Sequence, residues 1–110
     1  MSAAPQQHEA TISIDDDVAV LTEQIDALKR LAEQDTVSAE QIYDISIRWG
    51  TALAGRLPRL VYYSSLGALA DTDQRRFGEL CDELSALTPL VTKWGLARPV
   101  LPETPTASAG

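Results

Sequence analysis

Apolar residues recur at helical spacing in the first third of the chain. They are four or three residues apart in alternation, which places them in one narrow stripe along a helix. The positions are Ile14, Val18, Leu21, Ile25, Leu28 and Ala32. Three acids at 15–17 and two bases at 29–30 suit the dipole of a helix that starts and ends near them. The pattern predicts a helix over about residues 15–34.

A second helix is predicted from Ser38 onward. The residues Ser38 and Gln41 fit a capping box, in which side chains at the two positions satisfy each other's backbone N–H groups. Apolar residues follow on one face, at Ile42, Ile45, Trp49, Ala52 and Leu53. Gly55 is expected to end this helix in a left-handed turn, and Pro58 to begin the next one. The alternative is one long helix that bends at Pro58.

A third helix is predicted after the capping signal at Asp71–Gln74. Its apolar positions again alternate in threes and fours, at Phe77, Leu80, Leu84, Leu87, Val91 and Trp94. Pro89 interrupts this stripe, so the helix either stops near Thr88 or bends there. If it stops, Thr88 as N-cap with Pro89 in the first turn starts a short fourth helix that ends at Gly95.

These elements predict an all-α fold, a small antiparallel helical bundle of three long helices. The second helix is broken near Gly55–Pro58, and the bundle spans residues 14–101. Residues 1–13 and 102–110 are polar or small and lack an apolar period, so we expect two flexible tails. Trp49 and Trp94 are expected in the core.

The two apolar stripes, here called the helix seams, are the most informative feature of the pattern. Their members are Val18, Leu21, Ile25 and Leu28 in the first helix and Phe77, Leu80, Leu84, Leu87 and Val91 in the third. Two interpretations stay open. The seams pack against each other within one chain, or at least one of them is completed by a helix of another chain.

The charge distribution is uneven. The chain has a formal net charge of −7, and residues 1–46 hold ten acids against two bases. Such an acidic protein repels nucleic acid and anionic lipid over most of its surface. The basic residues are mainly arginine, which together with the many alanines suggests a GC-rich bacterial genome. One cysteine, no recognisable signal peptide and no apolar run of about 20 residues predict a cytoplasmic protein.

Few residues are suited to catalysis. His8 is the only histidine and lies in the predicted N-terminal tail, and Cys81 sits beside the seam residues Leu80 and Leu84. No glycine-rich phosphate loop is present, and the acids at 15–17 point in different directions around a helix start. We therefore expect no enzyme and no catalytic, metal-binding or cofactor-binding residues, and no cofactor.

One basic and aromatic segment stands out between the acids Asp44 and Asp71. It contains five residues that we predict to bind a partner: Arg48, Arg56, Arg59, Tyr62 and Tyr63. Arginines beside aromatic rings suit phosphate and base stacking, or a lipid headgroup layer. The competing interpretation is that the arginines pair with the acids of the first helix while the aromatic rings join the core.

The sequence as a whole predicts a non-catalytic regulatory or adaptor protein that acts through helix-mediated protein contacts. The expected partner is a protein, with a second copy of the chain, in a homodimer or a higher oligomer, as the first candidate. Reversal of Arg56 and Arg59 to glutamate is expected to weaken that contact without unfolding the domain. The alternative is a peripheral protein that binds nucleic acid or a membrane surface through residues 48–63.

Overall fold

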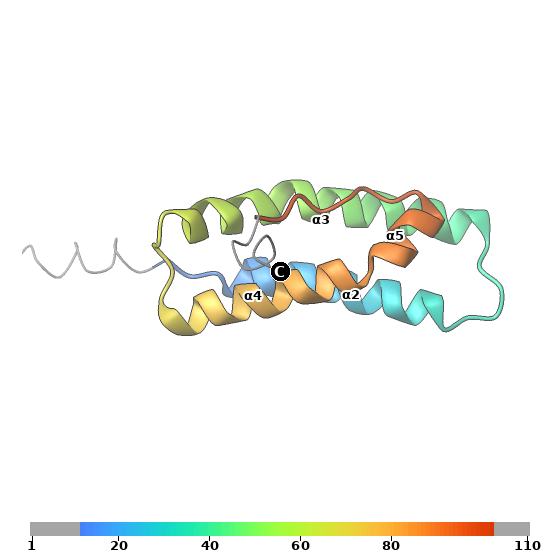
Figure 1. The fold of residues 1–110 in the computed structure, drawn as a ribbon. Helices are drawn as coiled ribbons and strands as arrows, with labels where there is room; N and C mark the ends of the chain where they lie inside the picture. The colour runs from blue at the N-terminus through green and yellow to red at the C-terminus, as the bar shows by residue number, and fades with distance from the viewer. Residues whose placement is uncertain (1–11, 103–110) are drawn as a thin grey trace, which may run out of the picture.

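Four helices account for most of residues 12–102, the part of the chain that the computed structural model describes. They are α2 (Asp15–Ala32), α3 (Ala39–Ser65), α4 (Asp71–Ala86) and α5 (Thr88–Trp94). The three long helices α2, α3 and α4 run antiparallel to their neighbours in sequence, and α5 leads from the end of α4 across to α3 (Figure 1). Within the described residues there is no strand, so the prediction of an all-α fold, a small helical bundle, is confirmed.

The start of each long helix has a local cause. Three acids in the first turn of α2 stabilise its positive end. The capping box predicted at Ser38 is present: Gln41 N donates to Ser38 Oγ over 3.1 Å, and Ser38 N donates to Gln41 Oε1 over 2.9 Å. The predicted cap of α4 is displaced by one residue. Asp71 is the first helical residue, and Ala70 holds the N-cap position without a side-chain hydrogen bond.

The prediction of a break near Gly55–Pro58 is wrong, because α3 continues through both residues to Ser65. The left-handed glycine lies after the helix, at Gly67, with φ 69°. An interior proline costs about 3 kcal/mol, while burial of Leu57 and Leu60 contributes about 1.5–3 kcal/mol each. Packing of α3 on both sides of Pro58 therefore offsets the cost of the proline, which agrees with the alternative of one long helix.

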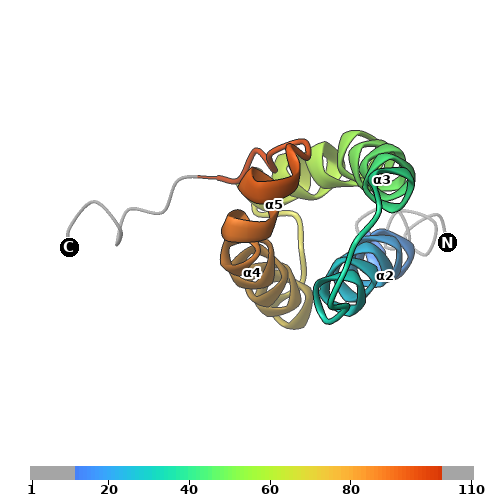
Figure 2. The same ribbon diagram turned by 90° about the vertical axis from the view of Figure 1, so that its right-hand side faces the viewer.

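A short fourth helix follows the third, as the alternative with a stop near Thr88 predicted, but its boundaries differ by one or two residues. The third helix stops at Ala86, and Leu87 rather than Thr88 is the N-cap of the short α5. Gly95 ends α5 in the left-handed conformation, with φ 65°. The chain then returns along α3 as an extended strap, residues 95–102 (Figure 1). In the end-on view α5 lies between α4 and α3 (Figure 2).

Both helix seams face the interior of the same chain. Eight of the nine seam residues are buried, and Val18 is half-buried against them. Trp49 is 1% exposed, and its indole Nε1 donates a hydrogen bond of 2.7 Å to the carbonyl oxygen of Ala97 in the strap. Trp94 is only partly buried at the edge of the core. The seams are therefore buried in the core of one chain, which is the first of the two interpretations left open by the sequence.

Most residues of the two predicted tails, His8 among them, lie outside the described part of the chain. Ile12, Ser13 and Pro102 are the tail residues that fall within it. Among the described helices, none is long and apolar enough to cross a membrane.

Candidate functional site

The basic segment is divided by its acidic neighbours. Arg56 and Arg59 lie one turn apart on α3 and both reach Asp17, at the start of α2. Arg56 Nη1 is 3.1 Å from Asp17 Oδ1, and Arg59 Nη1 donates to Asp17 Oδ2. The Asp17 side chain is 2% exposed, whereas the two guanidinium groups remain about two-fifths exposed. Since a buried carboxylate is unstable without partners, these two arginines hold α3 against α2.

The other three residues of the predicted partner site have different surroundings. Arg48 pairs with Asp44 one turn earlier on α3, over 3.3 Å, and both side chains are mainly exposed. The Tyr63 ring is partly buried and lies 5.2 Å below the Arg59 guanidinium, a cation–π contact. Tyr62 packs edge-on against Tyr63 but is itself 58% exposed. The structure thus brings Arg56, Arg59 and Tyr63 together as an internal clasp and leaves Tyr62 at the surface.

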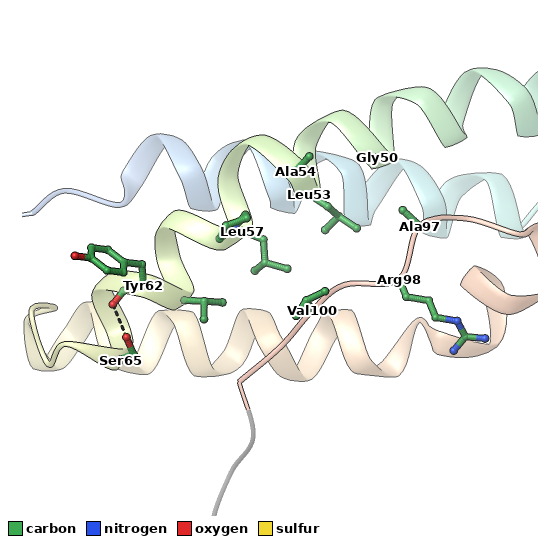
Figure 3. Close-up of a pocket in the computed structure, with 11 residues that line it drawn as sticks. Gly50, Leu53, Ala54, Leu57, Tyr62, Ser65, Ala97, Arg98 and Val100 are labelled. Carbon is green, nitrogen blue, oxygen red and sulfur yellow. Dashed lines mark hydrogen bonds between the residues drawn. The ribbon is translucent and has the colours of Figure 1, made fainter.

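An apolar groove runs along α3 beside the strap (Figure 3). Its volume is about 660 Å³. Residues of α3 form one side and the floor, and Ala97, Arg98 and Val100 of the strap form the other side. The residues from α3 are Gly50, Leu53, Ala54, Leu57, Pro58, Val61, Tyr62 and Ser65. Arg98 is the only charged residue among them, and its guanidinium points away from α3 (Figure 3). We call this hollow the α3 groove.

Exposed apolar side chains continue the same surface toward the N-terminal half of α3. Tyr43 is 69% exposed and Ile47 is 50% exposed. At 3.6 residues per turn, five apolar or small residues of α3 lie within an arc of about 100° around the helix axis. This arc is roughly opposite the core-facing side of the helix. This set, here called the outer face of α3, consists of Tyr43, Ile47, Ala54, Pro58 and Tyr62. α3 thus has apolar residues on two sides, one buried in the core and the other exposed.

The polar groups of the described residues do not gather into a reactive centre. Within residues 12–102 no group of three or more His, Cys, Asp or Glu side chains is placed to hold a metal ion. Cys81 is half-buried on α4. Burial, and secondarily the negative charge of Asp82, raise the pKa of its thiol to about 11. A thiol of this kind is a poor nucleophile at neutral pH.

Cys81 is expected to react slowly with a thiol reagent in the folded protein. At pH 8 a pKa of about 11 in place of the ordinary 9.0 lowers the thiolate fraction by about 100-fold. Since the folded state holds this proton more tightly, its contribution to stability is lost as the pH rises from about 9 to about 11. The rate of disulfide exchange with an aromatic disulfide, followed against pH, measures this. The chain unfolded in urea is the control, and an inflection near pH 9 in the folded protein would contradict the prediction.

Comparison with protein-family models, with curated proteins and with solved structures gives no match to this chain. The fold and the candidate site therefore stand on the residues of the chain itself.

The α3 groove and the exposure of Tyr43 and Ile47 beside it were not predicted from the sequence. The signal was present in the spacing, because apolar or small residues recur every three or four positions from Tyr43 to Tyr62 on the side of α3 away from Trp49. The predicted break at Gly55–Pro58 split that series into two short pieces. The second side of the groove comes from the strap residues 97–100, some forty positions away in sequence, and no local pattern places them beside α3.

Proposed function

We propose that the protein is a non-catalytic adaptor or regulatory protein that binds an apolar helix of a protein partner in the α3 groove. The observation that supports this most is the groove itself, a mainly apolar hollow without an acidic residue in its lining, on the same face of α3 as the exposed side chains of Tyr43 and Ile47. A contact surface of this kind binds through buried apolar area and excludes water from its centre.

The length of the groove favours a helix over a small ligand. Its lining on α3 extends from Gly50 to Ser65, which is about 22 Å at 1.5 Å per residue. The same length corresponds to about four turns of a helix laid along α3. An amphipathic helix that sets residues at every third or fourth position into an apolar groove is a common mode of peptide recognition.

Electrostatics direct a partner to this surface. The chain carries a formal net charge of −7, yet no acid lines the α3 groove. The acids of α2 repel an acidic partner, and such a partner meets no acid along α3 from Ile45 to Ser65. This differs from the contact first expected from the sequence: the helix seams supply the core, and the outer face of α3 supplies the binding surface.

Photo-cross-linking in the cells that make the protein tests this function. A benzophenone amino acid at position 62, in the groove, is expected to form adducts with a partner protein. The same group at the exposed position 72 on α4 is the control and is expected to form none. Ala54→Glu should remove the adducts, since it sets a carboxylate into the groove at an exposed helix position.

A matched substitution, Ala19→Glu, also replaces an exposed helix-interior alanine, but on α2. It should leave the adducts of position 62 unchanged, and both variants should keep the helical circular dichroism of the native chain. Absence of adducts at position 62, or adducts that survive Ala54→Glu, would contradict the proposed function.

A further inference from the structure

The two halves of the outer face of α3 have complementary shapes. The N-terminal half carries two projecting side chains, Tyr43 and Ile47, which are more than 45% exposed and do not line the groove. The C-terminal half contains the α3 groove, from Gly50 to Ser65. One surface thus carries both the projections and the hollow that fits them. Such a surface is self-complementary when a second copy is related to the first by a two-fold axis.

The spacing along α3 fixes the direction of that pairing. The series Tyr43, Ile47, Gly50, Ala54, Leu57 and Val61 has steps of four, three, four, three and four, which read the same in both directions. If two copies of α3 cross antiparallel at the level of residue 52, Tyr43 lies level with Val61 of the other copy and Ile47 with its Leu57. The small residues Gly50 and Ala54 then meet at the centre, where they allow the two helices to approach closely.

Charge along the same face favours the antiparallel direction. In this register Asp44, at the edge of the outer face, lies within one residue, about 1.5 Å along the axis, of the level of Arg59 of the other copy. The two-fold axis repeats this approach, so two such pairs of opposite charge are formed. A parallel pair would instead set Asp44 against Asp44 of the other copy. Between Asp44 and Asp71 the chain contains no acid, so α3 is the surface along which two copies of a chain of charge −7 approach with the least repulsion.

The exposed apolar area approaches what a dimer contact needs. With Tyr43 at 69% and Tyr62 at 58% exposure, and aromatic side chains of ~200 Å², the two tyrosines, Ile47 and Val100 expose on the order of 400–500 Å². A patch of this size is within the range of the largest apolar patch on a typical single chain, which often has a function. Both copies together contribute about 800–1000 Å², and the flanking polar side chains extend this toward the ~1200 Å² of the smallest stable interfaces.

We infer that the α3 groove is occupied by α3 of a second copy, antiparallel, with Tyr43 and Ile47 of each copy in the groove of the other. This inference rests on the proposed function and names its partner.

Light scattering of the purified chain tests the pairing. The expected mass at high micromolar concentration is twice the 11.9 kDa of one chain. Ala54→Glu, which changes the groove, and Ile47→Glu, which changes a projecting side chain, should each give a folded monomer. Ala19→Glu, on α2, should remain a dimer. A monomeric native chain at millimolar concentration, or a dimer that survives both substitutions on α3, would overturn the inference.

Engineered disulfides test the direction, in a Cys81→Ala background. In the antiparallel pair the two copies of residue 51 are about 3 Å apart along the helix axis, and the two copies of residue 40 about 36 Å apart. Thr51→Cys should therefore form a dimer disulfide in mild oxidant, and Glu40→Cys should not. Disulfide formation at both positions would indicate a parallel pair and overturn the inference.

The experiments distinguish a failure of the dimer inference from a failure of the proposed function. If the purified chain is a monomer while the benzophenone at position 62 still captures a different protein, the second copy is excluded and the proposed function stands. If position 62 captures no protein at all, including a second copy, the proposed function falls as well.

Discussion

Reversal of Arg56 and Arg59 to glutamate together is expected to unfold most of the chain, contrary to the expectation from the sequence, because both residues pair with Asp17. Asp17 is 1% exposed and both of its charged partners come from these two residues. Removing the partners of a buried charge costs about 3–5 kcal/mol, and two carboxylates in their place add repulsion. A fold of this size has a free energy of unfolding of about 5–13 kcal/mol, so most of that reserve is lost.

Urea unfolding followed by circular dichroism measures the effect, and Arg48→Glu is the matched control. Arg48 pairs with an exposed partner and its own side chain is 67% exposed, so its reversal should cost less than about 1 kcal/mol. Replacing all three ion-paired residues together, by Asp17→Leu, Arg56→Met and Arg59→Met, should restore stability, because apolar side chains of similar volume substitute well for a buried ion pair. A double reversal as stable as the native chain would show that Asp17 does not need its partners.

Leu84→Asp is the second substitution expected to unfold the protein. Leu84 is 1% exposed within the core between α4 and the other long helices. The change removes about 1.5–3 kcal/mol of apolar burial and sets a carboxylate in a place with no partner, which costs several kcal/mol more. We expect loss of most helical circular dichroism at 25 °C.

The neighbouring Ser85→Asp is the control for Leu84→Asp, because Ser85 is exposed on the same turn of α4. It should change the melting temperature by only a few degrees. If Leu84→Asp melted at the native temperature, the helix seam of α4 would not face the core.

Much of this fold follows from local pattern. The seams, the capping box at Ser38 and the end of the short last helix at Gly95 are set by neighbouring residues, so the sequence alone predicts them. The continuity of α3 through Pro58 is not local. It depends on Leu57 and Leu60 entering a core made with α2, and on the contacts of Arg56 and Arg59 with Asp17, some forty residues earlier. The local helix preferences of proline and glycine do not include the energy of such long-range contacts.

The candidate site illustrates the same limit. Arginines beside aromatic rings suggested a binding segment, and the competing interpretation, pairing with an acid of the first helix, is what Arg56 and Arg59 do. Tyr62 is the residue of that predicted site that lines the α3 groove. The groove needs the strap, which Trp49 fixes through Ala97, and this contact joins residues 48 positions apart.

Side-chain footprinting by hydroxyl radicals tests most directly whether the outer face of α3 is the contact surface. The dilute purified chain is compared with the assembled protein isolated from the cells that make it. Tyr43, Ile47 and Tyr62 are expected to be protected in the assembled protein, while the partly buried Trp94 on α5 reacts equally in both. Equal modification of the three α3 residues, with protection of Trp94 or another site instead, would contradict the account.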